Sequence, residues 1–193
     1  MKRKASLVSK DSLNNSSSKW IELKQIKYIN ENGRELQWES AERKRQTGAA
    51  AIIAILEPSQ RIILVRQFRP PSGGYVLEFP AGLMDENDSS PVQTALRELK
   101  EETGYIGTHV KTVPASFSSP GLSSESVYVV QLSVDENLPE NLNPQPAQEE
   151  TENIENFIVP LKKLSSFIEE RLQTGDLLDS KLAMFASGMA FNI

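Results

Sequence analysis

The sequence predicts an α/β domain preceded by a small antiparallel β-unit. Residues 49–56 form a continuous apolar run, which is typical of a strand buried on both faces. Residues 91–103 carry apolar side chains at helical spacing. Residues 20–30 and 34–40 alternate between apolar and polar side chains, which predicts the two strands of a hairpin.

Composition divides the chain into three parts. Residues 1–18 are rich in Ser, Asn and Lys and lack apolar periodicity, which predicts a disordered tail. Residues 19–47 hold the hairpin strands, joined by an Asn-Glu-Asn-Gly turn at 30–33. Residues 48–193 are predicted to form the main domain. Its length suits a single hydrophobic core.

The main domain continues with alternating strands and helices. After the buried strand at 49–56, we predict further strands at residues 61–68, 75–80, 110–117, 127–132 and 154–159, and terminal helices at 161–172 and 177–191. The acidic stretch 135–153 contains three prolines and is predicted to be a mobile loop, long enough to suggest a role in function.

The helix over 91–103 has the clearest boundaries. Ser90 precedes it as a capping residue, Pro91 suits the first helical position, and Gln93 can close a capping box with Ser90. Gly104 follows as a natural stop signal.

Composition excludes several classes of site. A net charge of -5 disfavours binding to the phosphate backbone of DNA or RNA. The chain has no cysteine and a single histidine, His109, so cysteine-ligated metals and histidine clusters are excluded. No apolar run approaches the roughly 20 residues of a membrane helix.

The N-terminus bears on the cellular location. Its basic residues are followed by polar ones instead of an apolar segment, which argues against a secretory signal. We expect a cytoplasmic protein, with the nucleus as an alternative. The Lys- and Ser-rich start weakly resembles a transit peptide and leaves the mitochondrion open.

Three carboxylates lie close together on the predicted helix. Glu98 and Glu102 are one turn apart beside the apolar stripe, and Glu101 lies on the adjoining sector. Their mutual repulsion would be relieved by a divalent cation, and hard oxygen ligands suit Mg²⁺ or Mn²⁺. The pattern alone is more typical of a solvated acidic face in which Arg97 pairs with Glu101.

The surrounding residues decide between these interpretations. Residues 82–105 closely resemble the Nudix box, and Arg97 to Gly104 match its Arg-Glu-aliphatic-x-Glu-Glu-x-Gly core without a gap. The interval from Gly82 to Arg97 is one residue longer than the box allows. We therefore expect a one-residue bulge, with Asp88 in place of the first Glu of the box; the alternative alignment puts Ser89 there.

The resemblance extends over about residues 18–193. The stretches 67–71, 73–75, 78–83 and 119–123 resemble the ADP-sugar pyrophosphatase branch of this family, particularly its eukaryotic ADP-ribose-cleaving members. The resemblance implies an α/β/α sandwich around a mixed sheet. It also implies a homodimer built with the N-terminal β-unit, with active sites that use residues of both chains.

The resemblance also implies roles for individual residues. For the metal, Glu98, Glu102 and the backbone carbonyl of Ala81 would bind Mg²⁺, with Glu101 completing the cluster. For the base, Trp20 and Trp38 would sandwich the adenine, and Glu39 would form a hydrogen bond to it. Arg43 and Arg69 would hold the diphosphate and ribose. Leu83 and Ser119 would add further contacts, and Ser119 replaces an Asp of the relatives.

The residue that activates water is expected in the acidic loop. By its distance from the following strand, Glu152 is the best match, and Glu101 is a second catalytic residue of the helix. Glu149, Glu150 and Glu155 are close enough in sequence to stay as alternatives.

The resulting hypothesis is Mg²⁺-dependent hydrolysis of ADP-ribose or a related ADP-sugar to AMP and a sugar phosphate. One alternative is a Nudix hydrolase of another nucleoside diphosphate, such as an oxidised guanine nucleotide. Another is a non-catalytic protein that binds ADP-ribose, and a third is a scaffold protein. We expect neither nucleic acid nor membrane as a partner.

Overall fold

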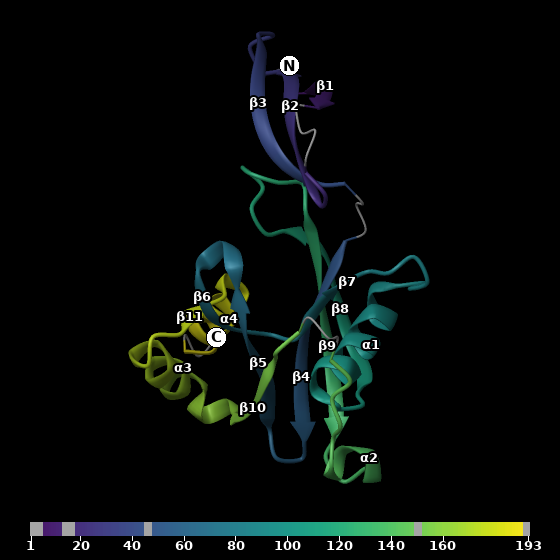
Figure 1. Cartoon of the computed structure of the whole chain (residues 1–193), viewed down its shortest axis with the longest axis vertical. Coiled ribbons are helices and arrows are strands. Elements are labelled where there is room, and N and C mark those ends of the chain that lie inside the picture. The colour runs from purple at the N-terminus through teal and green to yellow at the C-terminus, as the bar shows by residue number, and fades with distance from the viewer. Residues whose placement is uncertain (1–5, 13–17, 45–47, 149–151, 191–193) are drawn as a thin grey trace. The chain divides into compact units, whose positions relative to one another are not determined.

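The computed structural model describes residues 6–12, 18–44, 48–148 and 152–190 (Figure 1). The chain divides into two compact units. The first unit consists of Met1–Gly48 and Ala115–Val127, and the second of Ala49–Pro114 and Tyr128–Ile193.

The first unit contains a three-stranded antiparallel sheet in the order β1-β2-β3. Strands β2 (Ile21–Ile29) and β3 (Glu35–Arg43) form the predicted hairpin. At its turn, the Asn30 side chain accepts hydrogen bonds from the backbone N–H groups of Asn32 and Arg34 at 3.0 and 2.9 Å. These bonds set the register that places Trp38 opposite Ile26.

Residues Ser6–Ser12 form strand β1, although the sequence predicts a disordered tail there. It pairs with β2 from Ser6 opposite Ile29 to Ser12 opposite Lys24. Backbone N–H and C=O groups along an open strand edge pair with almost any extended segment, so an apolar pattern is not required. Residues 1–5 and 13–17 of the predicted tail lie outside the described residues, whereas Ser18 is described.

The second unit is built on a mixed sheet of eight strands. Six of them lie side by side in the order β11-β6-β5-β4-β9-β8, and the other two, β7 and β10, pair with β4 and β5. The strands are β4 (Ala49–Glu57), β5 (Arg61–Arg69), β6 (Gly74–Glu78), β7 (Ala81–Leu83), β8 (Thr108–Phe117), β9 (Ser126–Asp135), β10 (Glu155–Pro160) and β11 (Leu177–Leu178). Strand β11 pairs with β6 in a parallel arrangement.

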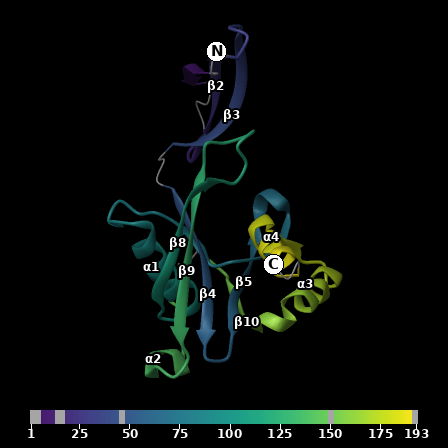
Figure 2. The same cartoon turned by 180° about the vertical axis from the view of Figure 1, so that it is seen from behind.

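Helices cover both faces of this sheet (Figures 1 and 2). Helix α1 (Pro91–Thr103) packs Ala95 and Leu99 into a core with β4 and β9. Helices α3 (Leu164–Gln173) and α4 (Ser180–Ala190) pack against a second core that includes Leu64 and Leu77. The predicted α/β/α sandwich is therefore confirmed.

The C-terminal segments differ in detail from the prediction. Residues 161–163 form a 3-10 turn before α3. Leu177 and Leu178 form β11 instead of starting a helix. The Asp179 carboxylate accepts from the backbone N–H of Lys181 at 2.9 Å and so caps α4, which explains why the helix starts only at Ser180.

Two short helices interrupt the loops. A 3-10 turn spans Pro70–Ser72, and α2 (Pro139–Leu142) lies inside the acidic stretch 135–153, which the sequence predicts to be a mobile loop. The helix is anchored because Asn141 is buried and its side chain bonds Ile106 and Asp135.

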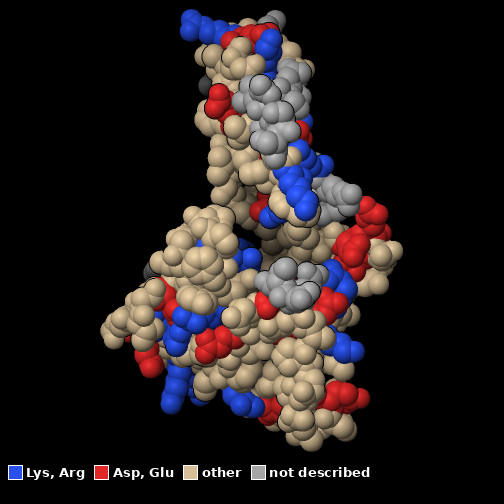
Figure 3. Space-filling view, viewed as in Figure 1, with Lys and Arg blue, Asp and Glu red and all other residues tan. Residues whose placement is uncertain are grey.

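The surface is mixed in charge. On the face of the second unit in Figure 3, acidic and basic side chains of the described residues are interspersed. Among the helices of the described ranges, none is long and apolar enough to span a membrane.

Candidate active site

Local signals fix both ends of the carboxylate helix α1. The Ser90 side chain accepts from the backbone N–H of Gln93, and Gly104 ends the helix in the left-handed conformation, at φ 78°. The Gln93 carboxamide accepts from the N–H and hydroxyl of Ser89, at 2.9 and 2.7 Å, instead of reaching Ser90 as predicted. The reciprocal contact lies one residue earlier, in the loop that holds the extra residue.

Arg97 connects this loop to the helix. Its guanidinium donates to Asp88 Oδ2 at 2.8 Å, to Glu98 Oε1 at 2.8 Å and to Glu101 Oε2 at 2.9 Å. It also donates to the backbone carbonyl of Leu83 at 3.1 Å. One side chain thus orients two of the predicted carboxylates.

Asp88 is the partner that completes this arrangement. Its carboxylate also accepts from the Thr94 hydroxyl at 3.0 Å and from the N–H of Asp85 at 2.9 Å. The hydrogen bond from Arg97 lowers the pKa of Asp88 from 3.8 to about 2. Asp88 therefore pairs with the helix, as expected for the residue that replaces the first Glu of the box, while Ser89 bonds Gln93.

Glu98 lies directly against the glycine that starts the motif. A Cβ placed on Gly82 would lie 1.9 Å from Glu98 Oε1 and 2.0 Å from its carboxyl carbon. Only glycine leaves room for the carboxylate at this point of the loop. Burial raises the pKa of Glu98, and the Arg97 guanidinium opposes that increase.

Glu102 is the most buried carboxylate of the helix, with 2% of its surface exposed. Its Oε2 accepts from the backbone N–H of Ala81 at 3.1 Å. Burial, followed by the charge of Glu98, raises the pKa of Glu102 to about 8, and the charges of Glu152 and Glu78 add to the effect. Several negative charges therefore converge on one buried position.

The negative charge of Glu152 contributes to the raised pKa values of both Glu98 and Glu102, which indicates that Glu152 lies near this helix. Of the alternatives, Glu155 forms an ion pair with Arg66 at 3.1 Å. Glu149 and Glu150 lie outside the described residues. The assignment of Glu152 as the base stays a prediction.

The helix carboxylates form no complete metal cluster: within the described ranges, no three Asp, Glu, His or Cys side chains are arranged to hold an ion. Glu98 and Glu101 are turned toward Arg97, and Glu102 accepts from Ala81. The residues nevertheless fit a hard divalent cation. Glu98, Glu101 and Glu102 supply carboxylate oxygens, the ligands that such ions prefer, and Gly82 leaves room for the Glu98 carboxylate against the loop.

Arg69 ends β5. Its Nε donates to Glu78 Oε1 at 2.9 Å. The Glu78 side chain is buried, and burial raises its pKa while the bond from Arg69 lowers it. Leu83, at the end of β7, is exposed and offers an apolar contact.

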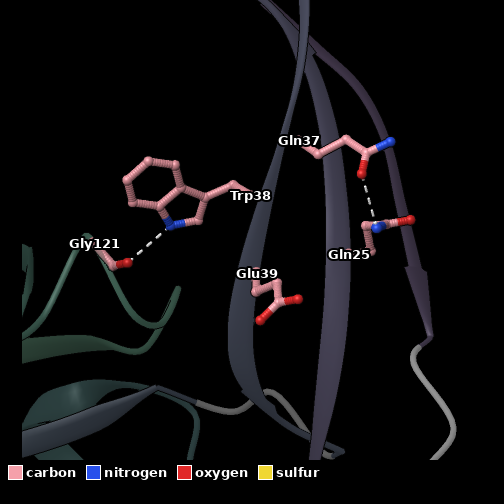
Figure 4. A pocket seen from close by; sticks show the side chains of 5 residues that line it. All are labelled: Gln25, Gln37, Trp38, Glu39 and Gly121. Atoms are coloured by element: carbon pink, nitrogen blue, oxygen red, sulfur yellow. Dashed lines mark hydrogen bonds between the residues drawn. The ribbon is translucent and has the colours of Figure 1, made fainter.

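The first unit holds a pocket of about 450 Å³ lined by Gln25, Gln37, Trp38, Glu39 and Gly121. The Trp38 indole N–H donates to the backbone carbonyl of Gly121 at 2.9 Å, and Gln25 Nε2 donates to Gln37 Oε1 at 3.1 Å. Figure 4 shows Trp38 extending from β3 toward Gly121, while Gln37 extends toward Gln25. Two of the predicted base-binding residues thus share one pocket.

The other predicted residues of this unit lie outside that lining. Trp20 is 71% exposed, and the Lys19 ammonium lies 4.5 Å from its ring centroid. The Arg43 guanidinium forms an ion pair with Glu125 at 2.6 Å. The Ser119 carbonyl accepts from the N–H groups of Leu122 and Ser123, at 2.9 Å each, and so closes a tight turn.

Sequence reasoning missed Gln25, Gln37 and Gly121 as pocket residues. The hairpin turn contains the signal for one of them. Counting outward from Asn30–Gly33 pairs Ile29 with Glu35, and the same count pairs Gln25 with Glu39. No comparable local signal points to Gly121, because its contact with Trp38 spans 83 residues.

Several known proteins are similar to this chain over most of its length. The chain is 35% identical over 193 residues to an uncharacterized Nudix hydrolase of Schizosaccharomyces pombe, covering 97% of this chain and 94% of the relative. It is 39% identical to an ADP-ribose pyrophosphatase of Saccharomyces cerevisiae, covering 90% and 78%. It is 35% identical to an ADP-sugar pyrophosphatase of Mus musculus, covering 77% and 71%.

The fold has a solved counterpart as well. A crystal structure of an ADP compounds hydrolase superposes with a TM-score of 0.63 at 22% identity, covering 86% of this chain and 84% of that one. Residues 45–179 match the family description of the NUDIX domain. Members of this family generally use a divalent metal ion. The chain therefore belongs to the Nudix hydrolase family.

Proposed function

We propose that this protein hydrolyses the diphosphate of ADP-ribose or a related ADP-sugar, in a Mg²⁺-dependent reaction that yields AMP and a sugar phosphate. The observation that carries the proposal is the packing of the Glu98 carboxylate against Gly82, together with the hydrogen bond of buried Glu102 to the backbone N–H of Ala81 at 3.1 Å. The names of the Saccharomyces and Mus relatives, an ADP-ribose and an ADP-sugar pyrophosphatase, support this choice of substrate.

The metal ligands in this proposal are Glu98, Glu102 and the backbone carbonyl of Ala81, with Glu101 completing the set. When bound, Mg²⁺ neutralises diphosphate charge and polarises the phosphorus under attack. Mn²⁺ suits the same oxygen ligands. Arg97 keeps Glu98 and Glu101 oriented through its bonds of 2.8 and 2.9 Å.

Glu152 is the proposed general base. Its carboxylate accepts a proton from a water molecule as the water oxygen attacks one phosphorus of the diphosphate. The bond between that phosphorus and the bridging oxygen breaks, and the electron pair leaves with the other phosphate. Glu101 is a second acidic group of the site, and its side chain is 42% exposed.

Arg69 is proposed to bind the diphosphate, because a guanidinium fork matches phosphate oxygens. Its ion pair with buried Glu78 fixes the direction of the side chain. Leu83 adds an apolar contact in the same unit. Arg43 and Ser119 are proposed substrate contacts of the first unit.

The nucleobase is proposed to bind in the pocket of the first unit. The Trp38 ring would stack on the base, which contributes roughly 1–3 kcal/mol. Glu39 would accept a hydrogen bond from the exocyclic amine of adenine. Trp20 supplies a second exposed aromatic surface for the base.

We also propose that the protein is a homodimer and that residues 19–47 contribute to the interface. Trp20, Ile21 and Leu23 are 71%, 52% and 48% exposed, and exposed apolar clusters are typical of interaction surfaces. Sedimentation equilibrium should give twice the chain mass of 21.5 kDa. We further propose a cytoplasmic location, which fractionation of cells would test.

The direct test is AMP release from ADP-ribose with Mg²⁺. The Glu98→Gln variant should lower kcat by about 100-fold or more, because it removes a metal ligand. Glu169→Gln, an exposed change on α3, should retain wild-type activity. If the unmodified protein releases no AMP from several ADP-sugars with Mg²⁺ or Mn²⁺, the proposed function is wrong.

A further inference from the structure

Residues 145–148, which precede Glu152 in the chain, contact the C-terminal end of α1. Gly104 permits this close approach, since a Cβ there would lie 2.4 Å from the backbone nitrogen of Gln145. The backbone N–H of Ala147 donates to the carbonyl of Glu101 at 2.8 Å. Carbonyls in the last turn of a helix have no partner within the helix, so the segment supplies one.

Gln148 extends this docking through its side chain. Its Nε2 donates to the carbonyls of Glu102 and Ile154 at 3.2 and 2.9 Å, and its Oε1 accepts from the N–H of Ile154 at 3.1 Å. A carboxamide has two N–H donors and one acceptor oxygen, and each of them is used here. The Gln148 side chain thus joins the helix end to the residue before β10.

The groups that Gln148 holds are firmly placed. Ile154 is 7% exposed. The Glu102 carbonyl also accepts from Asn156 Nδ2 at 3.1 Å, so β10 is tied to the same atom. Glu102 is itself the most buried carboxylate of α1. Glu152 lies between Gln148 and Ile154 in the chain, and its charge acts on Glu98 and Glu102.

We propose that Gln148 is a positioning residue: its side chain ties Ile154 to the end of α1, and these two anchors on either side of Glu152 in the chain let the Glu152 carboxylate face the helix carboxylates. The inference rests on the proposed function, in which Glu152 is the general base. It adds a residue to that site whose role is to fix the base, without contact with substrate.

The Gln148→Leu variant tests this role, because leucine removes all three bonds at similar size. Its kcat for ADP-ribose should fall about 10- to 100-fold, as expected for a displaced base, with KM changed less than about twofold. Gln145→Leu is the matched control. The Gln145 carboxamide bonds the carbonyl of Asn143 at 3.3 Å, so its loss should leave kcat unchanged.

A double-mutant cycle separates positioning from general destabilisation. In a Glu152→Gln background, adding Gln148→Leu should lower kcat no further, because the base is already absent. If the two losses multiply, Gln148 does not act through Glu152 and the proposal fails. An unchanged kcat in Gln148→Leu alone would overturn it as well.

Hydrogen exchange gives a readout that does not depend on turnover. The amide of Ile154 should exchange faster in Gln148→Leu than in the unmodified protein, and Gln145→Leu should match the unmodified protein. Unchanged exchange at Ile154 would overturn the proposed contact itself. If exchange accelerates while the unmodified protein releases no AMP, the contact stands and the failure belongs to the proposed function.

Discussion

The carboxylate helix of the second unit and the pocket of the first unit are built on opposite principles. Glu102 is 2% exposed and bonded to the chain through Ala81. Trp38 is 52% exposed and held by one hydrogen bond, to Gly121. The three predicted carboxylates of α1 each have a partner that restricts their direction, whereas the pocket offers open surface.

The difference suggests a division of work. Phosphoryl transfer depends on charged groups held in one geometry, and such groups need a rigid surrounding. Base recognition by stacking tolerates small movements of the ring. Changes near α1 should therefore act mainly on kcat, and changes in the pocket mainly on KM.

The largest expected effect comes from Gly82→Ala. The added Cβ would lie within 2.0 Å of the Glu98 carboxylate, so that carboxylate must move away from the loop. A displacement of about 1 Å at a reacting group can cost about 100-fold in rate, and we expect kcat to fall by at least that factor. Steady-state kinetics with ADP-ribose would measure it.

Gly188→Ala is the control for this change. Gly188 lies in α4, and a Cβ there would meet nothing within 4 Å, so the same substitution should leave kcat unchanged. If Gly82→Ala retains full kcat, the contact between Gly82 and Glu98 has no catalytic importance. The claim that catalysis depends on a rigid helix site would then be wrong.

Trp38→Ala should have an intermediate effect and act on KM. Loss of base stacking, at roughly 1–3 kcal/mol, corresponds to a rise in KM of about 5- to 150-fold with kcat nearly constant. Trp38→Phe keeps an aromatic ring and loses the bond to Gly121, so its KM should lie between those of the unmodified protein and Trp38→Ala. A large loss of kcat with unchanged KM would show that Trp38 serves the chemical step instead.

The two regions also differ in how far the sequence predicts them. Helix α1 was predicted at Pro91–Thr103, as observed, because Ser90, Pro91 and Gly104 are signals read within a few residues. Strand β1 was missed, because edge pairing with β2 depends on backbone groups and leaves little trace in side-chain pattern.

For the site, the residue types were predictable and most of their partners were not. Spacing along one helix places Glu98 and Glu102 together, and the resemblance to the Nudix box points to Asp88. The contact of Gln148 with the carbonyl of Glu102 spans 46 residues, and that of Trp38 with Gly121 spans 83. Such contacts exist only after the chain has folded, so no local pattern in the sequence carries them.

The smallest expected effect concerns stability, and it tests whether the rigidity of the helix site rests on Asp88. The Asp88→Asn variant keeps the shape of the side chain and loses its charge toward Arg97. Because hydrogen bonds to charged groups contribute about 2 kcal/mol, the free energy of unfolding at pH 7 should fall by about that amount. Glu169→Gln, on the exposed side of α3, should change it little.

The pH dependence of this effect follows from the lowered pKa of Asp88. Folding lowers that pKa from 3.8 to about 2, so the folded protein holds the ionised form more strongly than the unfolded chain does. The stabilisation is complete above about pH 4 and is lost as the pH falls toward 2.

Urea unfolding should therefore show a constant difference in the free energy of unfolding between Asp88→Asn and the unmodified protein from pH 7 to 5, and a shrinking difference below pH 4. A difference that stays constant into this acid range would mean that Asp88 acts through shape and not through its charge, and Arg97 would then hold Glu98 and Glu101 without help from the loop.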